Sequence, residues 1–141
     1  MTHITQNTSK GQLVTFLFGQ DAVAASQTDV QLPVVMNEAS LVMDGYCVPF
    51  DFEVIGVSAT STVAGTVGTL SVGATINGTE DADSTLSFTT GLNNYKRVAR
   101  GKVLGVAGDR IGCELTTTAD WSATVTDLIV TIYALVYLDG I

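Results

Sequence analysis

Apolar and polar residues alternate along several short segments of the chain, and this pattern predicts β-strands with one buried face. Between Gly68 and Asn77, every second residue is Leu, Val, Ala or Ile, and the residues between them are Thr, Ser or Gly. The same period of two runs through residues 55–60, 85–89 and 110–116. Asn77 and Gly78 accept positive φ at low cost, so they predict a tight turn between two strands. Together these segments predict an all-β, antiparallel sandwich of the jelly-roll type.

The last apolar segment differs because both of its faces are apolar. From Leu128 onward one face carries Leu128, Val130, Ile132, Ala134, Val136 and Leu138, and the other carries Ile129, Thr131, Tyr133, Leu135 and Tyr137. A sandwich strand needs only one apolar face, so something should cover the second. Either the N-terminal segment or a neighbouring copy of the chain could do so, and we favour the neighbouring copy.

The first 35 residues are less regular than the remainder. Residues 1–10 are polar, residues 13–18 are densely apolar and include Leu13, Phe16 and Phe18, and residues 21–26 are rich in alanine. We therefore expect an extended N-terminal arm over residues 1–35 and one sandwich domain over residues 36–141. The pattern leaves open whether the arm packs on its own sandwich or reaches a partner.

Composition supports a β-rich domain and excludes several classes of partner. The 141 residues are 46% hydrophobic and only 14% charged, with a formal net charge of -8. So few basic residues make nucleic-acid binding and attraction to an anionic membrane improbable. No apolar run is long enough to span a bilayer, and the polar N-terminus lacks the apolar core of a signal peptide. We therefore expect synthesis in the cytoplasm of the producing cell.

The sequence contains few residues suited to catalysis or metal binding. His3 is the only histidine, and Cys47 and Cys113 match no metal-ligand spacing, so we expect no catalytic triad, no zinc site and no cofactor. Cys113 alternates in phase with apolar neighbours and is interpreted as a small buried residue. A disulfide between the two cysteines has no further support. We expect that the protein is not an enzyme.

Two acidic groups leave minor alternatives open. Asp51 and Glu53 share a strand face by spacing, which would suit a pair of glycosidase carboxylates. The acidic stretch Glu80 to Asp83 is interpreted as a solvated hairpin loop, with a calcium site as the alternative.

The distribution of basic and aromatic residues suggests contact surfaces. Five of the six basic residues lie between positions 96 and 110: Lys96, Arg97, Arg100, Lys102 and Arg110. They are either solvated loop charges or a patch that meets an acidic partner. Trp121 lies in a polar, threonine-rich stretch, where it could anchor a partner, stack on a sugar or close one end of the sandwich.

Two runs of sequence resemble a known group of proteins. Residues 107–136, AGDRIGCELTTTADWSATVTDLIVTIYALV, resemble the closing strands of small jelly-roll proteins on tailed-phage virions. Residues 52–79, FEVIGVSATSTVAGTVGTLSVGATINGT, look like the opening hairpin of the same module. Among such proteins, small acidic chains with an N-terminal arm are most similar to capsid decoration, or cement, proteins.

This resemblance implies a homotrimer on the outer surface of a phage head, where it binds the major capsid protein and stabilises contacts between its copies. The interface residues expected from the arm, the last strand and the basic segment are Leu13, Phe16, Phe18, Trp121, Ile129, Tyr133, Leu135, Tyr137, Lys96, Arg97 and Arg100. The alternative is a carbohydrate- or receptor-binding module of a tail tip or head fibre, in which Trp121, Tyr95, Tyr133 and Tyr137 would stack on sugars.

Overall fold

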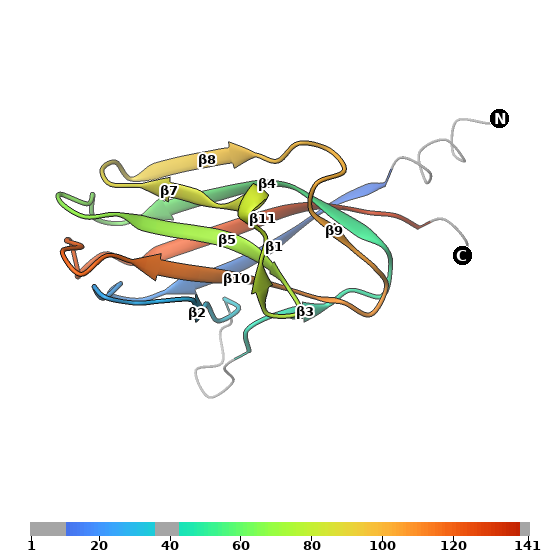
Figure 1. The fold of residues 1–141 in the computed structure, drawn as a ribbon, viewed down its shortest axis with the longest axis horizontal. Helices are drawn as coiled ribbons and strands as arrows, with labels where there is room; N and C mark the ends of the chain where they lie inside the picture. The colour runs from blue at the N-terminus through green and yellow to red at the C-terminus, as the bar shows by residue number, and fades with distance from the viewer. Residues whose placement is uncertain (1–10, 36–42, 139–141) are drawn as a thin grey trace.

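The computed structural model describes residues 11–35 and 43–138, which form two antiparallel β-sheets packed face to face (Figure 1). This confirms the predicted all-β sandwich. The first sheet runs in the order β1 (Gln12–Gln20), β11 (Leu128–Val136), β4 (Phe52–Ser61) and β8 (Asn93–Arg97), with β9 (Leu104–Gly105) also paired to β4. The second runs β2 (Val30–Gln31), β10 (Arg110–Thr117), β5 (Leu70–Ile76) and β6 (Thr79–Glu80), with β3 (Tyr46–Cys47) on β10 and β7 (Leu86–Phe88) on β5. Within the described ranges, no helix is long and apolar enough to cross a membrane.

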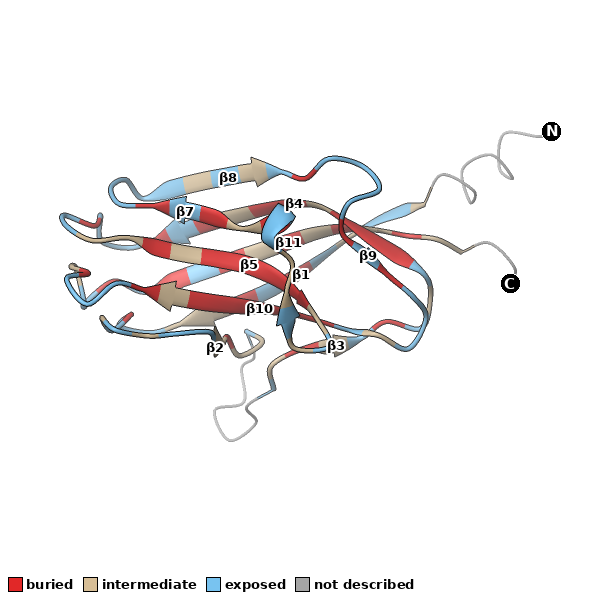
Figure 2. Cartoon of the chain, in the orientation of Figure 1, coloured by how far each residue is buried: buried red, intermediate tan, exposed pale blue. Residues whose placement is uncertain are grey.

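In the central strands, residues that alternate in the sequence point to opposite faces of the sheet. In β5 and β10, Val72 lies opposite Leu115, and both are completely buried between the sheets. Asn77 and Gly78 have φ values of 53° and 86° and close the hairpin between β5 and β6, as their residue types predicted. Figure 2 shows the buried positions concentrated along β4, β5, β10 and β11. The core is therefore the layer between the two sheets.

The described part of the expected N-terminal arm, residues 11–35, packs on the chain's own sandwich, which is one of the two possibilities that the sequence pattern left open. β1 pairs with β11 over its whole length, from Gln12 opposite Val136 to Gln20 opposite Leu128. The side chains of Phe18, Val23 and Leu32 are fully buried in the core. Their burial against both sheets supplies the apolar contact that a free arm would lack. Residues 1–10 of the expected arm lie outside the described residues.

The last strand, β11, has one buried and one open face. Leu128, Val130 and Ile132 point into the core, whereas Ile129 on the other face is 46% exposed. The described part of the N-terminal segment does not cover this outer face, because β1 lies beside β11 within the same sheet. Among the described residues, the outer face of β11 therefore remains uncovered.

Candidate interaction surface

The outer face of the first sheet brings together apolar side chains from four strands. Cross-strand register places Leu13 of β1 opposite Leu135 of β11, and Tyr95 of β8 opposite Ser58 of β4. Residues directly opposite each other share a face of the sheet. We call this surface the outer face, and its large side chains are Leu13, Leu17, Ile55, Tyr95, Ile129, Tyr133 and Leu135. Of these, Leu13 is 62% exposed and Tyr95 is 71% exposed.

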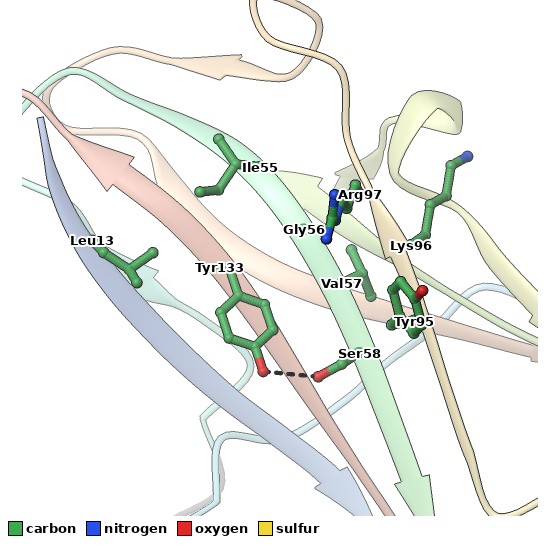
Figure 3. Close-up of a pocket in the computed structure, with 9 residues that line it drawn as sticks. All are labelled: Leu13, Ile55, Gly56, Val57, Ser58, Tyr95, Lys96, Arg97 and Tyr133. Carbon is green, nitrogen blue, oxygen red and sulfur yellow. Dashed lines mark hydrogen bonds between the residues drawn. The ribbon is translucent and has the colours of Figure 1, made fainter. Parts of the chain in front are cut away.

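A shallow hollow of about 440 Å³ lies in this face, between β1, β4 and β8. Leu13, Tyr95 and Tyr133 line it together with Ile55 and the backbone of β4 (Figure 3). The Tyr133 ring lies beside Gly56, where an added Cβ would meet Tyr133 Cδ1 at an ordinary contact distance of 3.5 Å. The Tyr133 hydroxyl and Ser58 Oγ share a hydrogen bond of 3.1 Å, which fixes the ring at the hollow.

Charge is divided unequally between the two outer faces of the sandwich. Arg97 is exposed beside the hollow of the first sheet. The second sheet instead gathers Asp29, Glu80 and Glu114 on its outer side. Burial, and then the neighbouring carboxylates, raise the pKa of Glu114, and burial raises the pKa of Glu80. These three carboxylates thus lie on the side of the sandwich away from the apolar outer face.

One carboxylate of the first sheet is fully engaged in an ion pair. Glu53 is 6% exposed and accepts hydrogen bonds from Arg100 Nε at 2.8 Å, from the Gly101 amide at 3.1 Å and from the Tyr137 hydroxyl. The hydrogen bond from Arg100, with those from Tyr137 and Gly101, lowers the pKa of Glu53 to about 2. Glu53 is therefore ionised at neutral pH and holds the loop after β8 against β4 and β11.

Asp51, the other candidate catalytic carboxylate, also binds a loop. Its Oδ1 accepts a hydrogen bond of 2.9 Å from the Ala107 amide. A glycosidase acid needs a raised pKa, which is the opposite of what Glu53 shows. The arrangement of Asp51 and Glu53 supports structural roles for both residues.

Three of the residues expected at an interface lie in the core instead. Phe16 and Phe18 are 8% and 0% exposed, because the inner side of β1 faces the second sheet. Trp121 is 4% exposed and packs against Gly65 near one end of the sandwich. Among the alternatives for Trp121, its burial supports the closing of the sandwich end over the anchoring of a partner.

The basic segment is also divided, since several of its charges bind within the chain. Lys96 Nζ donates to the Thr85 carbonyl at 3.2 Å, Arg100 pairs with Glu53, and Arg110 lies 3.4 Å from Asp44 Oδ1. Arg97 contributes to the hollow, and Lys102 is exposed. These residues do not form one continuous basic patch.

The acidic loop from Glu80 to Asp83 and the two cysteines are the remaining candidates for metal or thiol chemistry. Asp81 accepts from the Asp83 amide at 3.0 Å and thereby caps the short 3₁₀ turn η1 (Ala82–Ser84). Among the described residues, no three His, Cys, Asp or Glu side chains are grouped so that they could hold a metal ion. Both cysteines are free thiols: Cys113 is buried, as expected, and Cys47 is exposed.

Sequence reasoning found the apolar side of β11 but missed the hollow and the ion pair. Tyr95 and Tyr133 are both among the sugar-stacking residues of the carbohydrate-binding alternative, but nothing in the sequence places them at one hollow. Their meeting depends on the pairing of both β8 and β11 with β4. Glu53 and Arg100 are 47 positions apart, so no local pattern signals their contact.

Comparisons with known proteins show a similarity to solved structures. No family model matches the sequence, and no curated protein matches it. A solved structure described as "Cyanophage Pam1 capsid asymmetric unit" contains a chain that is similar at 14% sequence identity and a TM-score of 0.37, over 89% of this chain and 86% of that chain. A similarity of this size does not by itself assign a function.

Proposed function

We propose that the protein is a structural component of a phage virion, a decoration protein that binds the outer surface of the head and stabilises contacts between major capsid proteins. The observation that carries the proposal is the apolar outer face of the first sheet. An apolar sheet face that is left in water is a site of association. The resemblance of residues 52–79 and 107–136 to jelly-roll proteins of tailed-phage virions supports the same class.

The outer face also suits contact between copies of the chain, for which we propose a homotrimer. Leu13, Ile129 and Tyr133 can pack against a neighbour there, and the acidic residues Asp29, Glu80 and Glu114 lie on the opposite sheet. Copies that carry a net charge of -8 repel one another, so a contact away from the carboxylates is favoured. Each copy bound across a capsid junction would stabilise the assembled state by mass action.

A non-enzymatic role fits the side chains of the first sheet. Glu53, the most buried carboxylate on this sheet, is ionised and bound by three donors, which leaves it no proton to transfer. The hollow is lined mainly by apolar and aromatic groups. Such a surface provides binding area and no acid–base pair.

The proposal is tested with phage heads that lack this protein. The purified protein should sediment as a trimer, bind these heads and raise the temperature at which they release DNA. Ile129→Asp should weaken binding or trimer formation, because it places a charge on the outer face. Val125→Asp is the matched control, since Val125 is also exposed but lies in the loop before β11. A monomer without affinity for heads would contradict the proposal.

The second candidate is a carbohydrate-binding module of a tail tip or head fibre. Tyr95 and Tyr133 favour it, because both line one hollow and aromatic rings stack on sugars. Trp121 and Tyr137 do not support it, since Trp121 is buried and the Tyr137 hydroxyl is bound to Glu53. Binding on a glycan array that Tyr95→Ala abolishes would favour this candidate, and no binding to any glycan would count against it.

A further inference from the structure

The outer face of the first sheet is divided into two halves that differ in chemistry. Over β1 and β11 it carries exposed leucine and isoleucine side chains. Over β4 and β8 the register places Arg97 opposite Gly56, and Tyr95 opposite Ser58. Because Gly56 and Ser58 are small, the side chains of β8 stand at the rim of the hollow in this face. The second half therefore combines an aromatic ring, a cation and a hydroxyl group.

A second aromatic ring borders the hollow from the other side. Tyr133 of β11 lies opposite Gly56, so Tyr133 and Arg97 flank this glycine on one face of the sheet. Ser58 lies between the two tyrosines, and its Oγ is bonded to the Tyr133 hydroxyl at 3.1 Å (Figure 3). The hollow thus has a floor of small residues, two tyrosine rings and hydroxyl groups within reach of a ligand.

The charge that borders the hollow is positive. Of its two basic lining residues, Lys96 donates to the Thr85 carbonyl at 3.2 Å, and its ammonium group points away from both tyrosines (Figure 3). Arg97 is exposed at the rim. No carboxylate is among the described residues that line the hollow. In a chain with a net charge of -8, this is a surface that favours an anionic ligand.

We propose that this hollow binds a saccharide that carries a carboxylate, such as a uronic or sialic acid. One face of the sugar ring packs on the exposed ring of Tyr95. The sugar carboxylate accepts two parallel hydrogen bonds from the Arg97 guanidinium, a geometry that this planar group favours. The sugar hydroxyls bond to those of Ser58 and Tyr133. The inference rests on the second candidate function and names the class of sugar.

A saccharide fits the hollow better than an apolar protein surface does. An apolar partner would bury Arg97 and the hydroxyls of Ser58 and Tyr133 without supplying acceptors, and a buried polar group without a partner costs free energy. A sugar carries a hydroxyl on most of its ring carbons and so satisfies these groups. The half of the outer face that suits an apolar partner is the one with Leu13 and Ile129, over β1 and β11.

Two acidic probes test the site. One is a trisaccharide that ends in sialic acid, and the other is an oligosaccharide of alternating glucuronic acid and N-acetylglucosamine. Each is compared with a form of itself whose carboxyl groups have been reduced to alcohols, which keeps the sugar rings and removes the charge. Titration followed by NMR measures the affinity of the purified protein for each form. We expect at least one acidic probe to bind, and its reduced form to bind about tenfold more weakly.

Variants of the rim assign the contacts. Arg97→Gln should weaken binding of the acidic form by about tenfold and leave binding of the reduced form unchanged, because the lost interaction needs both partners. Lys102→Gln is the matched control, since it removes the same charge from an exposed residue outside the lining of the hollow. Tyr95→Ala should weaken both forms. The Tyr95 side chain is 71% exposed, so this change should leave the fold intact.

The outcomes separate this inference from the functions proposed above. Absence of binding to both acidic probes would overturn it, as would equal affinities for the acidic and reduced forms. Equal losses in Arg97→Gln and Lys102→Gln would also overturn it, because they would show attraction to charge in general. Binding of neutral glycans alone would overturn the acidic specificity and leave the second candidate function standing. Failure to bind phage heads, with acidic saccharide binding intact, would contradict only the decoration role.

Discussion

Arg100 donates to both carboxylate oxygens of Glu53, from Nε at 2.8 Å and from Nη2 at 3.3 Å. The acceptor is a strand residue of β4 and the donor belongs to the exposed loop after β8. Arg100 Nη2 also donates to the Tyr137 hydroxyl at 3.1 Å, which follows β11. The pair therefore joins three segments of the first sheet at the end where β9 pairs with β4.

This ion pair should make stability depend on pH in the acid range. The pKa of Glu53 is lowered from 4.5 to about 2, so its contribution is complete above pH 4.5 and is lost as the pH falls toward 2. Glu53→Gln should lower the free energy of unfolding at pH 7 by about 1–3 kcal/mol and flatten its slope below pH 4.5. Urea unfolding at several pH values measures both effects. Asp51→Asn, which alters one exposed hydrogen bond, should have the smaller effect.

The carboxylates on the second sheet should make stability depend on pH in the direction opposite to that of Glu53. Glu114 has a raised pKa, so the folded protein binds more protons than the unfolded chain, and stability falls as the pH rises above 4.5. Glu114→Gln should raise stability at pH 7 by up to about 1 kcal/mol and change little at pH 4. The amide retains the ability to accept from Gln31 Nε2, which lies 2.8 Å from Glu114 Oε2. Thermal unfolding at the two pH values checks this, and equal shifts at both would contradict it.

Gly105 should not tolerate a side chain. A Cβ at this position would overlap the ring of Phe52, which is 1% exposed and cannot move aside without disturbing the core. Gly105→Ala should therefore destabilise the fold by about 1–3 kcal/mol. Gly56→Ala is the control, since its Cβ would meet its nearest neighbour at an ordinary 3.5 Å. Equal denaturant midpoints for the two variants would contradict a steric clash between the Phe52 ring and a side chain at position 105.

Trp121 should contribute through its packing and not through its N–H group. The indole Nε1 is buried and, among the described residues, has no hydrogen-bond partner. Trp121→Ala should cost about 3–5 kcal/mol, whereas Trp121→Phe should cost clearly less because it keeps an aromatic ring and loses no hydrogen bond. Chemical denaturation compares the two variants. Equal losses would mean that the indole N–H has a partner.

The arm illustrates what a local pattern can miss. Residues 13–18 are densely apolar, which identified them as a segment to be buried, but the pattern did not say by what. Phe16 and Phe18 enter the sandwich only because β1 pairs with β11, which lies more than a hundred positions later in the chain. The same long-range pairing leaves Leu13 on the open side.

The roles of Trp121 and of the basic residues also depend on residues that are distant in the chain. Burial of Trp121 depends on the approach of Gly65, a residue of a distant loop. Arg100 and Lys96 differ in role because their partners come from different segments: Glu53 belongs to β4, and the Thr85 carbonyl follows η1. Residue type alone could not distinguish the paired charges from Arg97, which faces the hollow.

The sequence by itself determined the class of fold, because alternation with a period of two places apolar side chains on one face of each strand wherever the strand lies. It also determined the Asn77-Gly78 turn and the second apolar face of β11. Tertiary structure alone decided which of these faces is buried in the core and which charges are paired. The physical reason is that burial and ion pairing depend on the strand that lies alongside, and sheet pairing brings together residues that are far apart in the chain.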